Sequence, residues 1–271
     1  MLAGIYVNKE RDIGLAFTEK FVGLLRKEKI DYVLHDSLRS DRFSDAAYFG
    51  DDCEPRPDII VALGGDGTML SAVGFAAPAG LPVFGINLGS MGFLSAMTGD
   101  DPYECVKILK SGAYTVSYRT MLETEVCGVR YHALNEIVFY KRNVGKTVIV
   151  SVKVDGSEIG SYKADGFIVS TPTGSTGYAL SSGGPVVSPD VKCRLLVPIC
   201  CHNLVARPVI ADEDCVVTID GSEKGCVIVD GKVVDGEAES LKIVKSAYKA
   251  GLVNPSGFDF YDRINRKLGG K

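Results

Sequence analysis

The stretch IIVALGGDGTML, residues Ile59 to Leu70, decides the fold of this chain. It begins with an unbroken apolar run, which indicates a strand buried on both faces. Two glycines end the run, and a helix candidate, Thr68 to Ala77, follows at once. A strand that leads directly into a helix is the repeating unit of a parallel sheet. One carboxylate, Asp66, lies in the bend between the two elements, and its role is the question that the rest of the sequence has to answer.

The residues around this stretch repeat the alternation of strand and helix. The predicted strands are Ala3–Val7, Tyr32–His35 and Leu81–Asn87; the predicted helices are Asp12–Lys29 and Asp101–Gly112; the polar segment Asp36–Pro57 is a predicted loop. Strands that alternate with helices predict an α/β N-terminal domain with a parallel sheet covered on both faces.

After about residue 112 the sequence changes to short β-like runs that end in turn residues. Asp-Gly occurs six times in the chain, five of them at or beyond Asp155, and this dipeptide is typical of type I′ hairpins. Gly145-Lys146, between two such runs, is also predicted to form a hairpin turn. We therefore expect an α/β domain over residues 1–115 and a β-rich domain over 116–249. The tail, residues 250–271, is expected to form a short helix that packs back on the α/β domain.

The composition limits the classes of function. The chain has 271 residues, 24% of them charged, a net charge of −4, and no stripe of basic and aromatic residues. This argues against a nucleic-acid partner and against a polybasic membrane surface. The eight cysteines are scattered without CxxC spacing, and no apolar run approaches the length of a membrane span. Because no signal peptide is recognised, we expect a cytoplasmic protein.

The GGDGT bend has two interpretations that its residues alone leave about even. Backbone N–H groups and the positive end of a helix dipole lie at such a bend, and phosphates bind there readily. Asp66 repels an anion, so it suits a sugar hydroxyl from which it accepts a proton or a hydrogen bond. The alternative is that Asp66 caps the following helix while the glycines serve a tight turn.

Familiar nucleotide fingerprints are missing. Tyr140 stands where a Walker A motif ending at Gly145-Lys146 needs its first glycine, and no G-x-G-x-x-G follows Val7. Protein-kinase signatures are also absent. Any nucleotide that this chain binds therefore uses a different loop.

Three further segments carry candidate binding residues. Asn87–Ser95 places an aromatic, Phe93, beside loop glycines, although an ordinary loop with a core phenylalanine has the same pattern. Asn135-Glu136 opens a strand, where the two side chains suit a purine edge and ribose hydroxyls or simply cap the strand. Asp165–Pro185 contains a buried strand, Phe167–Ser170, followed by hydroxyls and glycines that favour a ligand bearing sugar and phosphate oxygens. A lone histidine such as His202 is more often structural than catalytic.

In this order and spacing, the segments resemble the NAD kinase family. That family combines GGDGT, an N-x-G-x-x-G-F loop, an Asn-Glu pair, a DG…STPTGSTAY segment followed by GGP, and an H-x-L-x-x-R-P element that corresponds here to His202–Pro208. The resemblance covers nearly the whole chain, and the TPTGST segment is its most specific part. GGDGT alone is shared with diacylglycerol-type lipid kinases and relatives of phosphofructokinase.

The resemblance implies transfer of the γ-phosphate of ATP to the 2′-hydroxyl of the adenosine ribose of NAD, which forms NADP. It also implies the α/β plus β-rich fold, an NAD site in the cleft, and assembly as a homodimer or homotetramer. Mg²⁺ or another divalent cation is expected to arrive with ATP, and no metal tightly ligated by the protein is expected.

The resemblance assigns roles to individual residues. Asp66 is implied to contact the 2′-hydroxyl and to act as the proton acceptor. The implied NAD-binding residues are Gly67, Phe93, Asn135, Glu136, Lys163, Asp165, Thr173, Thr176, Gly177, Tyr178 and Ser181. The implied ATP or phosphate contacts are Gly64, Gly65, Thr68 and His202.

Three positions depart from the family pattern. Gly177 replaces the usual Ala, Ser90 stands where many members have Arg, and Cys201 stands where Pro often precedes the histidine. None of these removes an implied catalytic group. Two other functions stay open: a lipid kinase that shares GGDGT and presents an apolar or basic surface, and a nucleotide sensor without catalysis.

Overall fold

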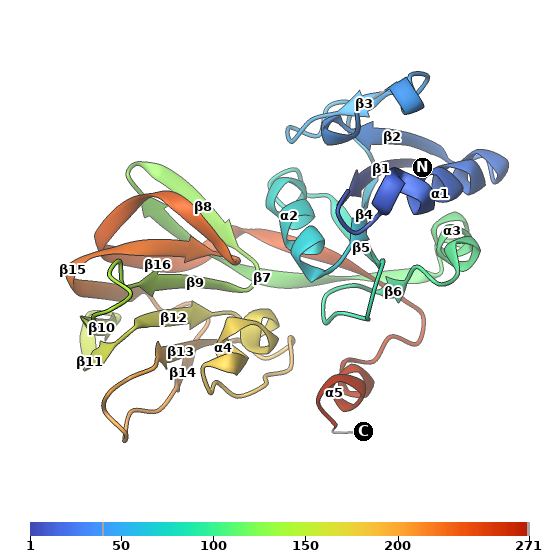
Figure 1. Cartoon of the computed structure of the whole chain (residues 1–271). Coiled ribbons are helices and arrows are strands. Elements are labelled where there is room, and N and C mark those ends of the chain that lie inside the picture. Colours follow the sequence, from blue (N-terminus) through green and yellow to red (C-terminus); the bar gives the residue numbers. More distant parts are fainter. Residues whose placement is uncertain (40, 270–271) are drawn as a thin grey trace. The chain divides into compact units, whose positions relative to one another are not determined.

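The computed structural model describes residues 1–39 and 41–269 (Figure 1). The chain divides into two compact units: unit 1 contains Met1–Tyr118 and Lys249–Lys271, and unit 2 contains Arg119–Tyr248. The domain limits expected from the sequence, 1–115 with 250–271 and 116–249, stay a prediction, because compactness does not test a division by function.

Unit 1 alternates strands with helices in its first hundred residues, as the sequence predicted. In chain order its elements are β1 (Leu2–Val7), the 3₁₀ turn Ile13–Leu15, α1 (Ala16–Lys27), β2 (Asp31–His35), the 3₁₀ turns Asp36–Leu38 and Asp41–Phe43, β3 (Tyr48–Phe49), β4 (Ile59–Gly64), α2 (Asp66–Ala76), β5 (Pro82–Asn87), β6 (Met97–Thr98), α3 (Pro102–Ser111) and, after unit 2, α5 (Phe260–Leu268).

The main sheet of unit 1 is parallel and has the strand order β5-β4-β1-β2-β3. The chain moves outward from β1 through β2 and β3, and then returns to the other side of β1 with β4 and β5. Such a reversal brings the loops after neighbouring strands together at the carboxyl edge of the sheet, where α/β proteins bind ligands. The GGDGT bend follows β4 at this edge.

Helices cover both faces of this sheet (Figure 1). Phe21 and Leu25 of α1 belong to one buried cluster with Ile5 of β1 and with α3. On the opposite face, Phe75 of α2 packs edge-on against Tyr6, with the ring centroids 5.3 Å apart. Because adjacent strand residues point to opposite faces, Ile5 and Tyr6 supply the two layers.

Some element boundaries differ from the sequence predictions for local reasons. The helix predicted over Asp12–Lys29 begins only at Ala16. The Asp12 carboxylate accepts hydrogen bonds from the amides of Phe17 and Thr18 in the first turn, so Asp12 itself stays outside the helix. The segment 36–57 is not one loop: it contains two 3₁₀ turns and β3, which pairs with β2. By contrast, α3 ends at Gly112 in the left-handed conformation, as predicted.

Unit 2 is built mainly from strands. In chain order its elements are most of β7 (Tyr114–Val126), β8 (Val129–Ala133), β9 (Glu136–Tyr140), β10 (Val148–Val154), β11 (Ser157–Ala164), β12 (Gly166–Ser170), the 3₁₀ turn Thr173–Thr176, α4 (Tyr178–Ser181), β13 (Cys193–Ile199), β14 (Val209–Asp212), β15 (Val217–Val229) and most of β16 (Lys232–Pro255).

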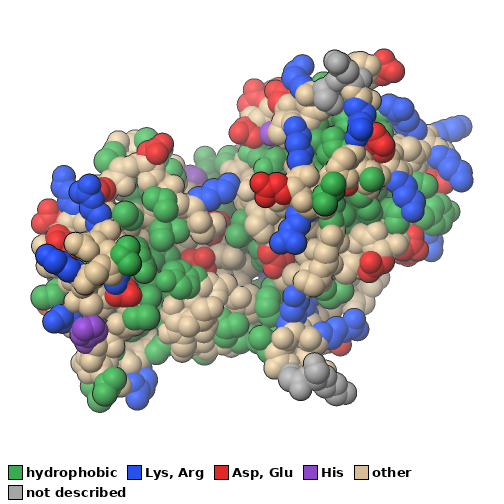
Figure 2. All heavy atoms as spheres, in the orientation of Figure 1, with side chains coloured by type: hydrophobic (Ala, Val, Ile, Leu, Met, Phe, Trp, Pro, Cys, Tyr) green, Lys and Arg blue, Asp and Glu red, His purple; other side chains and the backbone are tan. Residues whose placement is uncertain are grey.

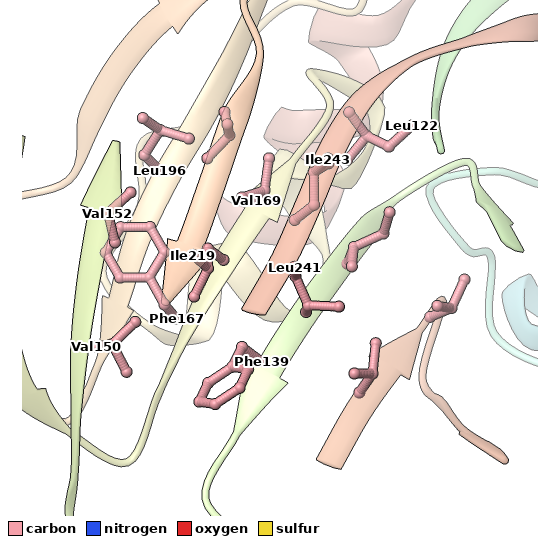
Figure 3. Packing of buried hydrophobic residues seen from close by; sticks show 14 of the residues in the cluster. Leu122, Phe139, Val150, Val152, Phe167, Val169, Leu196, Ile219, Leu241 and Ile243 are labelled. Atoms are coloured by element: carbon pink, nitrogen blue, oxygen red, sulfur yellow. The ribbon is translucent and has the colours of Figure 1, made fainter. Parts of the chain in front are cut away.

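The strands of unit 2 pair antiparallel, and β9 lies between β12 and β15. One apolar layer collects side chains from several strands, among them Phe139, Phe167 and Leu241 (Figure 3). All three are fully buried or nearly so. Both faces of β9 are buried: Ile137 and Phe139 belong to this layer, whereas Val138 belongs to a second cluster. Glu136 shares the face of Val138.

The Asp-Gly dipeptides behave in two ways. Asp155-Gly156 and Asp230-Gly231 have positive φ angles at both residues and close hairpins, as predicted. Two others lie inside β15 and β16, and Asp165-Gly166 joins β11 to β12, which pair with other strands. The hairpin predicted at Gly145-Lys146 is wrong, because β9 and β10 on either side of it also pair with other strands.

The C-terminal tail packs on unit 1, as the sequence predicted. Gly251 and Leu252 of β16 pair in parallel with β5. The helix α5 follows, and its buried residue Arg263 donates hydrogen bonds to the loop between β5 and β6. Unit 1 therefore contains two pieces of chain that lie far apart in the sequence.

The surface mixes charges of both signs. On the face that Figure 2 shows, Lys and Arg side chains are interspersed with Asp and Glu side chains. Among residues 1–39 and 41–269, no helix has both the length and the apolar character needed to span a membrane. The same residues contain no group of three or more His, Cys, Asp or Glu side chains arranged to hold a metal ion.

Candidate active site

The GGDGT bend is tighter than the sequence suggested. Helix α2 begins at Asp66 rather than at Thr68, and Gly65 is its N-cap residue. The Gly65 amide donates to the Thr68 hydroxyl over 3.3 Å. A Cβ at Gly64 would lie 2.1 Å from that hydroxyl oxygen, so only glycine fits there. The proposal that Asp66 caps the helix is therefore wrong.

The Asp66 carboxylate instead turns toward the loop between β5 and β6. It accepts hydrogen bonds from the amide of Phe93 (2.7 Å), the amide of Leu94 (3.2 Å), and both the amide and the hydroxyl of Ser95 (3.4 and 3.2 Å). Three successive backbone N–H groups aimed at one anion form the concavity known as a nest. We call residues 92–96 the nest loop.

The nest loop depends on one glycine that leaves room for the carboxylate. A Cβ at Gly92 would lie only 1.9 Å from the Asp66 Oδ1 atom. Asn87 supports the loop from β5, because its Nδ2 donates to the Ser95 hydroxyl over 3.1 Å. Phe93 is half-buried, with the Lys267 amine 6.0 Å from its ring centroid. Two of the predicted site residues of unit 1, Asp66 and Phe93, are therefore in direct contact.

Arg263 of α5 holds the other side of the nest loop, and the sequence analysis did not single it out. Its guanidinium donates to the carbonyl oxygens of Gly92, Phe93, Ser95 and Ala96. It is only 5% exposed. Its position in a mostly polar helix gave no signal in the sequence, because the contact spans 171 positions.

Asn135 and Glu136 lie together in unit 2, and each has an oxygen with no partner. Glu136 is 5% exposed at the first position of β9. Among the described residues, neither the Asn135 Oδ1 atom nor the Glu136 Oε2 atom has a hydrogen-bond donor, although both are buried. Buried polar atoms in native proteins are normally paired, so these two mark a place for a ligand.

Burial raises the pKa of Glu136 to about 7, and the nearby Asp230 charge adds to this. The Tyr178 amide, which donates to the carboxylate, opposes the shift. A carboxyl group with this pKa changes its charge near neutral pH, which is typical of functional sites. A ligand hydroxyl that donates to the second oxygen favours the charged form.

Asp230 is a second residue that the sequence analysis did not assign to the site. Its carboxylate accepts from the amides of Leu134 (2.8 Å), Asn135 (2.7 Å) and Glu136 (3.2 Å). Burial raises its pKa, while these three amides act against that shift. The Asp-Gly pattern predicted only a hairpin here. The turn places the carboxylate against the strand start that carries Asn135 and Glu136.

Some side-chain hydroxyls of the segment after β12 form hydrogen bonds to backbone groups of unit 2. Thr171 donates to the Leu134 carbonyl over 2.6 Å, and Ser175 both donates to and accepts from the backbone of Val187. These buried hydroxyls build the loop rather than a ligand surface. The predicted ligand residues Thr173 and Thr176 are half-buried, and the Thr176 hydroxyl donates to the Thr173 carbonyl.

Gly177 and Tyr178 complete the cluster around Glu136. A Cβ at Gly177 would lie 2.8 Å from the Glu136 Oε2 atom and 3.4 Å from the Asn135 Nδ2 atom. The absence of a side chain at Gly177 therefore keeps space beside the unpartnered oxygen. Tyr178 is 37% exposed, and burial raises the pKa of its phenol. Ser181 is exposed at the end of α4.

Of the remaining predicted residues of unit 2, Asp165 lies near enough to Tyr178 for its charge to help raise the pKa of that phenol, and Lys163 and His202 are exposed. Asp165 accepts a hydrogen bond from Lys141 over 2.6 Å, and this lysine is 9% exposed. Lys163 is exposed, and its carbonyl accepts from the His202 amide over 2.8 Å. His202 itself is exposed in the segment after β13. Lys141 was not predicted, although its charge is what balances Asp165.

Both halves of the chain match known families. Residues 16–114 match the ATP-NAD kinase N-terminal domain, and residues 134–254 match the ATP-NAD kinase C-terminal domain. Among curated proteins, the NAD kinase of Natranaerobius thermophilus is 34% identical over 280 residues, which cover 98% of this chain and 97% of that protein. The NAD kinase of Caldicellulosiruptor saccharolyticus is 31% identical and covers 99% of both chains.

Solved structures agree with these matches. An NAD kinase from Archaeoglobus fulgidus in complex with ATP superposes with a TM-score of 0.78 at 30% identity, and covers 99% of this chain and 98% of that one. Yeast NADH kinase complexed with NADH has the same fold, with a TM-score of 0.86 at 24% identity over 100% of this chain and 88% of that one.

The matches place the chain among the phosphotransferases. More narrowly, it belongs to the NAD kinase family, and its activity is that of a NAD kinase. The mixed α/β and β-rich architecture predicted from the sequence is confirmed.

Proposed function

We propose that this chain transfers the γ-phosphoryl group of ATP to the 2′-hydroxyl of the adenosine ribose of NAD, with Asp66 as the base. The ribose oxygen forms a bond to phosphorus, the bond from phosphorus to the bridging oxygen of ADP breaks, and the hydroxyl proton passes to the carboxylate. Family membership supports this reaction. Relatives solved with ATP and with NADH support the two substrates.

The observation that carries the role of Asp66 is its fixed position at the carboxyl edge of the parallel sheet. Three amides and one hydroxyl hold the carboxylate, so its orientation does not depend on a ligand. Phosphoryl transfer needs positioning more than covalent help, and a fixed acceptor satisfies that need.

In this proposal, Asn135 and Glu136 bind the adenine and ribose of NAD. Their two unpartnered oxygens match a ligand that donates from an amino group and from hydroxyls. The further proposed NAD contacts are Gly67, Phe93, Lys163, Asp165, Thr173, Thr176, Gly177, Tyr178 and Ser181.

The phosphates of ATP are proposed to approach Gly64, Gly65 and Thr68 at the start of α2, and His202. A helix N-terminus provides N–H groups and a favourable dipole for phosphates. A divalent cation such as Mg²⁺ is proposed to enter with ATP as part of the substrate, where it neutralises the phosphate charge. A homodimer or homotetramer and a cytoplasmic location stay predictions.

A coupled assay tests the proposal. The purified chain is incubated with NAD and Mg-ATP, and the product is offered to a dehydrogenase specific for NADP. We expect NADP to accumulate in proportion to ADP. Release of ADP only after lipid addition, without NADP, would instead favour a lipid kinase. Nucleotide binding with no turnover would favour a sensor.

The same assay tests the cation. With excess chelator, we expect the rate to fall to background and to recover when Mg²⁺ is restored, because the uncompensated triphosphate charge opposes transfer. Full activity in excess chelator would contradict this part of the proposal.

A further inference from the structure

Arg263 is a buried cation whose donors all point at one short loop. It belongs to α5, and four carbonyl oxygens between Gly92 and Ala96 accept from its two Nη atoms. Its guanidinium also lies over the Phe258 ring, 4.7 Å from the ring centroid. The ring and the carbonyls together hold the side chain in one orientation.

The nest loop presents its two sides to opposite charges. Its carbonyls face Arg263, while its amides at Phe93, Leu94 and Ser95 face Asp66. A peptide unit points its carbonyl and its N–H in opposite directions, so holding the Gly92 and Phe93 carbonyls also fixes the amides of Phe93 and Leu94. The cation therefore controls the direction of two of the donors that hold the carboxylate.

Arg263 is a buried cation that lies close to Asp66. Burial lowers the pKa of Arg263, and Asp66 is the largest contribution that opposes this shift. Of the ion pairs within 4.0 Å among the described residues, none includes Arg263. Desolvation of an unpaired charge is costly, and an apolar side chain fills such space at lower cost. The loop carbonyls, the Phe258 ring and the nearby Asp66 charge are the groups that compensate this desolvation.

We propose that Arg263 is a positioning residue for the reaction: it holds the nest loop so that the loop amides fix the Asp66 carboxylate in its reactive orientation. The inference rests on the proposed role of Asp66 as the base. Through this one side chain, helix α5 affects kcat.

The first test compares Arg263→Met with a control on the same helix. Arg266→Met removes a cation that is 65% exposed and is paired with Asp262, so it should leave kcat within about twofold of the wild-type value. Arg263→Met should lower kcat by about 10²-fold, since a misplacement of about 1 Å at the reacting group has that effect. The KM for ATP should change much less than kcat.

The second test is a double-mutant cycle with Asp66→Asn. If Arg263 acts through Asp66, Arg263→Met should lower kcat by less than about threefold in the Asp66→Asn background, because the two changes remove the same contribution. Multiplicative effects would overturn the proposal. An Asp66→Asn variant that keeps the wild-type rate would instead overturn the proposed base, so the two failures are distinguishable.

Arg263→Lys is a second variant that keeps the proposal testable if Arg263→Met does not fold. A lysine keeps the charge but cannot span four carbonyls as the planar guanidinium does. We expect a folded protein with kcat between those of the wild type and Arg263→Met, and faster amide hydrogen exchange confined to residues 92–96. Wild-type kcat in Arg263→Lys together with faster exchange in the nest loop would overturn the inference.

Discussion

Asp66 of unit 1 and Glu136 of unit 2 are both carboxylates with a proposed role toward the substrates, yet their surroundings are opposite. Asp66 is surrounded by four donors, so its acceptor sites are largely filled before any ligand arrives. Glu136 is buried with one oxygen that no donor reaches. The contrast teaches that a reacting group is held still by its protein, whereas a recognising group is left incomplete for its ligand.

The residues that hold the segments around the two carboxylates differ in charge. Asp66 is held by the nest loop, whose carbonyls accept hydrogen bonds from a cation, Arg263. Glu136 begins a strand, and the amides at this strand start donate hydrogen bonds to an anion, Asp230. The charge of Asp230 also helps to raise the pKa of Glu136. The following changes test whether the distinction holds.

Asp66→Asn should have the largest effect. A general base contributes typically about 10²–10⁴-fold, so kcat should fall by about that factor. The asparagine keeps the shape of the side chain but presents an NH₂ group to amides that need an acceptor. The rate is measured with the coupled NADP assay, and circular dichroism checks that the fold is intact. A rate near that of the wild type removes Asp66 from the base role.

Gly92→Ala should have the next largest effect. The new Cβ would lie 1.9 Å from the Asp66 Oδ1 atom, so either the carboxylate or the nest loop must move. We expect kcat to fall by about 10²-fold, since displacement of a reacting group by about 1 Å is enough for that loss.

Gly89→Ala is the matched control for this change, because it lies in the same loop region. Its Cβ would approach other atoms no closer than 3.7 Å, which is ordinary contact. It should retain near wild-type kcat. If both alanine variants lose activity equally, the loop tolerates no substitution and the close approach at Gly92 explains nothing.

The pH dependence of NAD binding should be the third effect in size. Since the pKa of Glu136 is about 7, the free enzyme loses its carboxylate charge as the pH falls below 7. The KM for NAD should therefore be roughly tenfold higher at pH 6 than at pH 8. Glu136→Gln should remove this dependence. A KM that varies equally in both proteins would point to another titrating group.

Glu136 also makes a prediction about stability. Its pKa is raised from 4.5 in the unfolded chain to about 7 in the folded protein, so the folded state prefers the protonated form. The stabilisation is full below pH 4.5 and is lost as the pH rises through about 7, with a magnitude on the order of 3 kcal/mol. Urea unfolding at pH 5 and pH 8 should show this difference in the wild type and a smaller one in Glu136→Gln.

Gly177→Ala should have the smallest effect. Its Cβ would lie 2.8 Å from the Glu136 Oε2 atom, which is the far end of a flexible side chain. A shifted rotamer costs about 1 kcal/mol, so the KM for NAD should change by less than about fivefold, with kcat nearly unchanged. A loss of folding stability instead would mean that the Glu136 side chain cannot move aside.

The sequence predicted what local patterns encode. The strand, the glycines and the helix around GGDGT were found because apolar period and glycine positions are local signals. The limits of α3 were found for the same reason, since Pro102 and Gly112 mark its two ends. Asn135 and Glu136 were singled out as an adjacent pair, and their role toward a ligand stays a prediction. Each success depended on residues within a few positions of one another.

The supports of the site were not predictable in this way. Nothing in the residues around Asp230 shows that its carboxylate meets an amide 95 positions earlier. Nothing in the residues around Asp66 predicted that its carboxylate binds a loop 27 to 29 positions later. The hydroxyls of Thr171 and Ser175 looked like ligand contacts but satisfy backbone groups of their own unit. Such choices are made by tertiary packing.

The contact between Arg263 and the nest loop can form only some time after the ribosome has synthesised the nest loop. Arg263 follows Gly92 by 171 positions. At roughly 5–20 residues per second, a ribosome completes the nest loop roughly 9–34 s before it adds this arginine. During that interval the nascent chain already carries Asp66, Asn135 and Glu136. If the arginine sets the carboxylate as we propose, the growing polypeptide holds the parts of a kinase without its turnover until the last helix emerges.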